Sequence, residues 1–151
     1  MFDGHRKTLD EHLAFGSWHL AFNRSRTNER LQNLTVWEKA HLLTLEIYKS
    51  TTGFPREELF GLTSQMRRCS ASIGANIAEG CGKRGNNEFQ RFLQIAAGSA
   101  SELDYHLILA HDLKFLNEAD YQSLHRHLTQ LRKMLSALLQ KIEHDLLIAK
   151  C

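Results

Sequence analysis

Bulky apolar residues recur at helical spacing in two consecutive stretches in the middle of the chain. In the first stretch, steps of four and three positions alternate through Leu62, Met66, Cys69, Ile73 and Ile77. Because a helix turns by about 100° per residue, this spacing places the five side chains on one face. The opposite face carries Arg68, Ala71, Ser72, Ala75, Ala78 and Glu79. Apart from Arg68 and Glu79, these residues are small. We therefore predict a helix, starting near residue 57 or 62 and ending at Glu79, that neighbours can approach closely from both sides.

The second stretch, from about Asn87 to Asp112, repeats this pattern. Its apolar stripe comprises Phe89, Phe92, Leu93, Ala96, Ala100, Leu103, Leu107 and Ala110. Further apolar residues spread toward the back of the same helix. Two consecutive helices with more apolar surface than one core requires predict self-association. The expected contact residues between copies are Ala71, Ala75, Ala78, Tyr105, Ile108 and Leu109.

Two further helices are predicted on either side of this pair. The earlier one spans about Thr35 to Thr51, carries the stripe Val36, Ala40, Leu43 and Ile47, and stops before Gly53 and Pro55. The later one follows Asn117, which we expect to cap its first turn. Its stripe is Leu124, Leu128, Leu131, Leu135, Leu138, Ile142 and Leu146. Its far side is expected to face solvent through Arg126, Lys133, Gln140 and His144, and its charges are evenly mixed in sign.

Four helices joined by short loops predict an all-α fold, an antiparallel up-down-up-down four-helix bundle formed by residues 33–151. The connection between the two central helices, GCGKRG, contains three glycines in six residues. Glycine permits positive φ angles, so this segment predicts a break in the helix. No alternation of apolar and polar residues predicts a strand.

Residues 1–32 form the least patterned part of the chain. Four apolar residues, Leu13, Phe15, Trp18 and Phe22, lie at approximate helical spacing and are followed by the polar segment NRSRTNERLQN. One interpretation is a flexible N-terminal extension. The other is a docking segment whose Phe15 and Trp18 enter a groove on another chain.

The composition of the chain indicates the number of domains and the cellular environment of the protein. A length of 151 residues suits one domain, and 42% apolar residues can form a core. Three cysteines, Cys69, Cys81 and Cys151, lack metal-type spacing, which favours a reducing, cytoplasmic environment. Charged residues interrupt the first 22 residues, so neither a signal peptide nor a membrane span is predicted.

Basic residues outnumber acidic ones in the central region, although the formal net charge is only +2. The candidates for phosphate contact are Arg67, Arg68, Lys83, Arg84 and Arg91. They form two small groups near opposite ends of the first central helix, roughly 22 Å apart at 1.5 Å per residue. Self-association would bring together copies of both groups. Two interpretations remain open, namely phosphate contact and ordinary surface charge with some ion pairs.

Polar residues in the same region are interpreted as structural. We expect Asn76, Glu79, Ser99 and Glu102 to satisfy one another inside a packed interface, because an unpaired buried charge is costly. A specific hypothesis is an ion pair from Glu79 to Arg91 between the two central helices.

No pattern of residues predicts a catalytic or metal site. His125 and His127 are two positions apart and His106 and His111 five apart, unlike the usual histidine ligand pairs. Neither Ser99 nor Ser101 belongs to a nucleophile motif, and GCGKRG matches neither a Walker loop nor a dinucleotide fingerprint. We therefore expect a protein that is not an enzyme and has no cofactor and no bound metal.

Three segments together carry a family resemblance. LTVWEKAHLLTLEIYK begins near Leu34, RR precedes SASIGANIAEGCGKR, and EFQRFLQIAAGSASEL follows. They resemble the four-helix bundle family first noticed as reading frames inside intervening sequences of bacterial 23S ribosomal RNA genes. The family includes the accessory variability determinant of diversity-generating retroelements. The resemblance extends to about Lys150.

The resemblance implies an oligomer, a five-subunit ring. In retroelement members the ring is positively charged, binds nucleic acid and associates with the reverse transcriptase. Transferred by position, the contact residues are the five basic candidates given above. Two functions follow as alternatives: a scaffold that binds RNA, with a reverse transcriptase as a further partner, or a protein-interaction ring that docks a partner through apolar surface.

Overall fold

The computed structural model describes residues 35–149, and within this range the chain is all-α. Four long helices are present: α3 (Thr35–Ser50), α4 (Leu62–Gly82), α5 (Asn86–Asp112) and α6 (Glu118–Ile148). Two short 3₁₀ turns, η1 (Thr51–Gly53) and η2 (Arg56–Glu58), join α3 to α4. The prediction of an all-α fold with four helices is confirmed, and the helices contain the expected segments. The calls on residues 1–32 and on Cys151 lie outside the described range.

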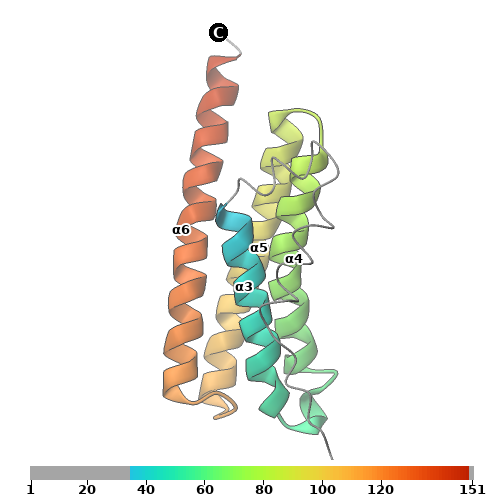
Figure 1. Cartoon of the computed structure of the whole chain (residues 1–151), viewed down its shortest axis with the longest axis vertical. Helices are drawn as coiled ribbons and strands as arrows, with labels where there is room; N and C mark the ends of the chain where they lie inside the picture. Colours follow the sequence, from blue (N-terminus) through green and yellow to red (C-terminus); the bar gives the residue numbers. More distant parts are fainter. Residues whose placement is uncertain (1–34, 150–151) are drawn as a thin grey trace, which may run out of the picture.

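The four helices lie side by side around a shared core (Figure 1). The connection from α4 to α5 is at one end, and the connections from α3 to α4 and from α5 to α6 are at the other. Each helix packs on the next, and α6 also packs on α3. The most extensive contact is between α4 and α5, the two helices with small residues.

The core is formed by the stripes that the sequence predicts. Every member of the α3 and α4 stripes is buried, as are seven of the eight predicted residues of α5. The exception in α5 is Phe92, which is only partly buried because it lies over the end of α4. In α6, Leu138 and Leu146 are partly buried and pack against the core. The C-terminal end of α6 extends beyond the other helices (Figure 1). Regular burial on one face of each helix supplies most of the stabilisation.

Small residues on α4 let α3 pack closely. The Thr44 hydroxyl lies 2.9 Å from the Ala40 carbonyl on its own helix and 3.0 Å from the Ser70 carbonyl on α4, either of which can accept its hydrogen. Gly74 faces the Trp37 indole, whose Nε1 would be 3.9 Å from an added Cβ. The α3–α4 contact therefore combines a polar link at Thr44 with close packing at Gly74.

The end of α4 differs from the prediction. The helix does not break after Glu79 but continues to Gly82, so Gly80 is helical. A Cβ at Gly80 would lie 2.9 Å from both Phe89 Cδ2 and Phe92 Cβ. Gly80 is thus required for close approach of α5, and the chain reverses at Gly85, whose φ is +95°.

The start of α6 confirms the predicted cap. The backbone N–H of Asp120 donates to Asn117 Oδ1 at 2.8 Å, and the Asn117 amide donates to the Asp120 carboxylate at 2.8 Å. Asp120 also places a negative charge at the helix N-terminus, where the helix dipole favours it.

We expect Gly80→Ala to destabilise the protein, because a methyl group cannot fit against Phe89 and Phe92 without moving backbone or ring atoms. Overpacking of this kind typically costs about 1–3 kcal/mol. Gly98→Ala is the matched control, since Gly98 is also helical but nothing lies within 4 Å of its added Cβ. There the better helix propensity of alanine should stabilise by about 0.5–1 kcal/mol. Urea unfolding measures both; equal effects would contradict the packing role of Gly80.

Candidate functional site

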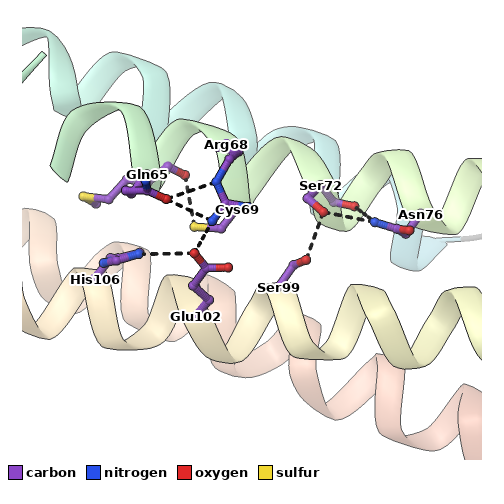
Figure 2. A network of polar contacts seen from close by, with 9 residues as sticks. Gln65, Arg68, Cys69, Ser72, Asn76, Ser99, Glu102 and His106 are labelled. Carbon is purple, nitrogen blue, oxygen red and sulfur yellow. Dashed lines mark hydrogen bonds and ion pairs between the residues drawn. The ribbon is translucent and has the colours of Figure 1, made fainter. Parts of the chain in front are cut away.

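A line of polar contacts runs along the outer side of the α4–α5 contact (Figure 2). The Arg68 guanidinium forms an ion pair with Glu102 across the two helices and donates twice to Gln65 Oε1, at 3.0 Å each. Arg68 and Glu102 are partly exposed, so the pair adds modestly to stability. The pair joins α4 to α5.

His106 continues this line on α5. Its Nε2 lies 3.5 Å from Glu102 Oε1, a pair that becomes ionic when the imidazole is protonated. Both ring nitrogens are buried and have no hydrogen-bond partner in the structure. Glu102 is therefore shared between Arg68 on α4 and His106 on its own helix.

Nearer the other end of the same contact, serine and asparagine replace the charged residues. The hydroxyls of Ser72 and Ser99 are 2.9 Å apart and join the two helices. The Asn76 amide donates to the Ser72 carbonyl at 2.8 Å and to the Ser72 hydroxyl at 3.0 Å. Ser72, Ser99 and Asn76 thus satisfy one another, as Glu102 does with Arg68.

The hypothesis of a Glu79–Arg91 ion pair is wrong. Glu79 pairs at 3.2 Å with Lys83, the residue directly after α4, and Arg91 lies 3.9 Å from Glu88 on α5. Both side chains are more than half exposed, because the inner positions at this end are taken by Gly80 and the phenylalanines. Glu79 is therefore a surface residue rather than part of a buried polar contact.

Cys69 lies under the polar line and is fully buried. Its Sγ lies 3.4 Å from the Met66 carbonyl, to which the thiol donates. Burial raises the pKa of the Cys69 thiol from 9.0 to about 12, and the negative charge of Glu102 contributes to the increase. The thiol is thus protonated at neutral pH, which is the opposite of what a nucleophilic cysteine needs.

The first group of predicted phosphate contacts is engaged in intramolecular contacts. Arg67 lies against the end of α3: its Nε donates to Thr51 Oγ1 at 2.8 Å, and its guanidinium lies 4.9 Å from the centre of the Tyr48 ring. Arg68 is paired with Glu102. Both cations are therefore used to hold helices together, a role that the sequence pattern did not reveal because the partners are distant in the chain.

The second group lies around the α4–α5 turn. Lys83 pairs with Glu79 and lies 5.3 Å from the centre of the Phe92 ring, while Arg91 neighbours Glu88. Arg84 is exposed in the turn. The structure thus keeps the five candidates in two separate places, as the sequence indicated, and four of them have an acidic or polar partner.

The predicted contact residues between copies divide into two sets. Ala71, Ala75, Tyr105 and Ile108 are exposed, and Tyr105 is 60% accessible. Ala78 and Leu109 are partly buried and pack against the core of their own chain, so the structure places them less favourably for contact with a second copy.

A charged network between α5 and α6 was not anticipated from the sequence. Asp104 binds His125 Nδ1 at 3.1 Å through one oxygen and the Arg132 guanidinium through the other. The His125 ring also stacks on Tyr121, which stacks on His111. Asp104 and Arg132 are 28 positions apart, and no local spacing links residues so far apart.

Within residues 35–149, no group of three or more histidine, cysteine, aspartate or glutamate side chains is arranged to hold a metal ion. Several histidines contact carboxylates instead, for example His111 with Glu118 at 2.8 Å and His127 with Glu46 at 2.7 Å. The arrangement favours interhelical pairing over chemistry at a metal centre. None of the described helices is long and apolar enough to cross a membrane.

Fold and site together define a small helical bundle whose polar residues mainly join helices. The family model for the 23S rRNA-intervening sequence protein matches residues 32–137, and the chain belongs to this family. The predicted resemblance is confirmed, although the match ends within α6, before Lys150.

A solved structure is similar to the chain. It is a protein of unknown function from the S23 ribosomal protein family of Bacteroides thetaiotaomicron, 27% identical, with a TM-score of 0.63. The similarity covers 70% of this chain and 98% of that one. Among curated proteins, none matches the chain.

We expect the free energy of unfolding to fall between pH 9 and pH 12 in part because of Cys69. A thiol whose pKa is raised by folding contributes stability fully below its unfolded pKa of 9.0, and this contribution is lost as pH rises toward about 12. Urea unfolding at pH 8 and pH 10.5 should therefore show a larger loss for the wild type than for Cys69→Ala. Rapid alkylation of native Cys69 by iodoacetamide at pH 8 would contradict a buried, protonated thiol.

Proposed function

We propose that the protein is a non-enzymatic scaffold that assembles with copies of itself and binds RNA. In this proposal the subunit is an antiparallel up-down-up-down bundle, five copies form a ring, and the setting is cytoplasmic. The observation that carries the proposal is the surface of α4 and α5. Beside its polar contacts, this surface still exposes small and apolar residues after the bundle has buried its core.

The exposed residues on these two helices support assembly. Ala71 and Ala75 are exposed on α4, and Ile95, Tyr105 and Ile108 are exposed on α5 with 43–60% of their surface accessible. A four-helix bundle that is already filled gains nothing from these residues within one subunit. Small residues beside large apolar ones allow two helices from different copies to approach closely.

RNA is proposed as the ligand because the family is named for its position within ribosomal RNA genes and the chain carries a modest positive charge. Assembly would repeat each basic side chain around an axis and increase the local potential. By family resemblance, a reverse transcriptase is a further partner if the gene belongs to a retroelement.

A second candidate is a protein-interaction ring without nucleic-acid binding. The specific observation in its favour is the α3–α4 connection, where Phe60 is 90% and Leu59 is 52% exposed. An aromatic side chain at this exposure fits a groove on a partner protein. The intramolecular pairing of Arg67, Arg68 and Lys83 points the same way.

Sedimentation velocity tests the assembly. We expect a species several times the 17.4 kDa of one chain at micromolar concentration. Ala75→Glu should shift it toward the monomer, because it places a charge in the proposed contact, whereas Gln130→Glu, at an exposed position of α6 outside that contact, should not. A monomeric wild type would remove the ring from the proposal.

RNA binding is tested by fluorescence anisotropy with a structured RNA at two salt concentrations. Phosphate contacts release counterions, so affinity should fall steeply with salt. In the second candidate, binding of the protein partner depends on apolar contact and changes little with salt. No measurable RNA binding at low salt would remove the RNA-binding function.

A further inference from the structure

Helix α6 contains equal numbers of acidic and basic residues, but the two kinds lie in different parts of the helix. The helix contains four acidic residues and four Lys or Arg residues. The acids lie near its ends, at Glu118, Asp120, Glu143 and Asp145, so residues 121–142 contain no carboxylate. Those residues carry all four cations, Arg126, Arg132, Lys133 and Lys141. Although acidic and basic residues are equal in number over the whole helix, residues 121–142 therefore form a basic segment. This segment is about 33 Å long at 1.5 Å per residue.

Fewer cations of this segment than of the α4 region are paired with a carboxylate or another polar side chain. Within residues 35–149, only Arg132 of the four forms an ion pair, and its partner is Asp104. Arg126 and Lys133 are exposed and seven positions apart, so they lie on the same outer face of α6. By contrast, Arg68 and Lys83 are held by carboxylates and Arg67 by Thr51.

A groove between α5 and α6 adjoins these cations. It has a volume of about 430 Å³ and is open to solvent on one side. Three of the side chains that line it are small, namely Ala97 and Ser101 of α5 and Ser136 of α6. Its lining residues are Ala97 and Ser101 of α5 and Thr129, Arg132, Lys133, Leu135, Ser136 and Leu139 of α6. The lining contains three hydroxyls and two cations, and none of the lining residues is acidic.

We propose that this groove binds the sugar-phosphate backbone of RNA. Its main cations are Lys133, which lines the groove, and Arg126, which lies beyond the lining on the same face of α6 as Lys133. This proposal rests on the proposed function and assigns its ligand to a place different from the α4 candidates. Lysine and arginine contact phosphate oxygens, and serine and threonine hydroxyls contact phosphate and ribose. Leu135 and Leu139 supply an apolar floor beside the polar edge.

The composition of the groove favours RNA over an acidic protein segment. An acidic peptide is bound mainly by paired cations, which the groove supplies only at Arg132 and Lys133. Three hydroxyls, Ser101, Thr129 and Ser136, add contacts that suit alternating phosphate and ribose groups. Such contacts position a backbone without reading its sequence, so we expect little dependence on base sequence.

The test compares two double variants in the full chain. Arg126→Glu with Lys133→Glu changes the face beside the groove. Lys39→Glu with Lys49→Glu changes two exposed lysines of α3, which does not line the groove. Each pair lowers the formal charge by four, from +2 to −2, so the long-range effect of net charge is matched. Circular dichroism and sedimentation velocity check that both variants keep the wild-type fold and assembly.

The measurement is anisotropy with a fluorescent single-stranded RNA across a range of salt. We expect the α6 variant to raise the Kd by at least about tenfold at low salt and to reduce the slope of log affinity against log salt by about 1.5, the loss of two phosphate contacts. The α3 variant should change the Kd much less. Unlabelled RNA should compete far better than poly-glutamate of equal charge.

The outcomes separate this proposal from the one on which it rests. If the wild type does not bind RNA, the proposed function fails. If the wild type binds and the α6 and α3 variants weaken equally, or the α6 variant is unchanged, the groove is not the site. If only the double variant Lys83→Glu with Arg84→Glu loses RNA binding, the binding site lies at the α4–α5 turn and not in the groove. Equal competition by poly-glutamate would overturn RNA as the ligand.

Discussion

The close approach of α5 to α4 is the constraint on which the rest of the bundle depends. At one end it requires Gly80, because Phe89 and Phe92 occupy the space of a side chain. Further along, Ser72 and Ser99 meet directly, and beyond them Arg68 and Glu102 pair across the helices. Along the α4–α5 contact, small residues are thus followed by polar residues and then by charged residues. The other two helices pack on a pair whose geometry this contact already fixes.

This constraint also explains where the charges are found. Helices that approach closely leave no inner room for long side chains, so Arg68 and Glu79 lie at the outer edge. There they meet carboxylates or cations on the same or the adjacent helix. The contact between α5 and α6 is less extensive than that between α4 and α5 and keeps an open groove between them. Of the cations beside that groove, Arg132 is paired with Asp104, whereas Arg126 and Lys133 form no ion pair within the described residues.

Local patterns in the sequence were sufficient for the elements and the core. Apolar periodicity identified four helices and nearly all of their buried residues, because burial on one face of a helix is a local property. The cap at Asn117 was equally local, since donor and acceptor are three positions apart. The glycine-rich turn was located correctly, but Gly80 was assigned to the turn, because glycine spacing alone does not distinguish a helix break from a close contact.

What the sequence determined by itself was therefore the class of fold, the family and the set of residues facing inward. Tertiary structure alone decided the pairing of charges. Arg67 with Thr51, Arg68 with Glu102 and Arg132 with Asp104 join residues 16 to 34 positions apart. Glu79 and Arg91 took nearer partners instead. The physical reason is that helix packing, which depends on side-chain size over whole interfaces, sets which charges come within reach of one another, and a linear pattern contains no such distances.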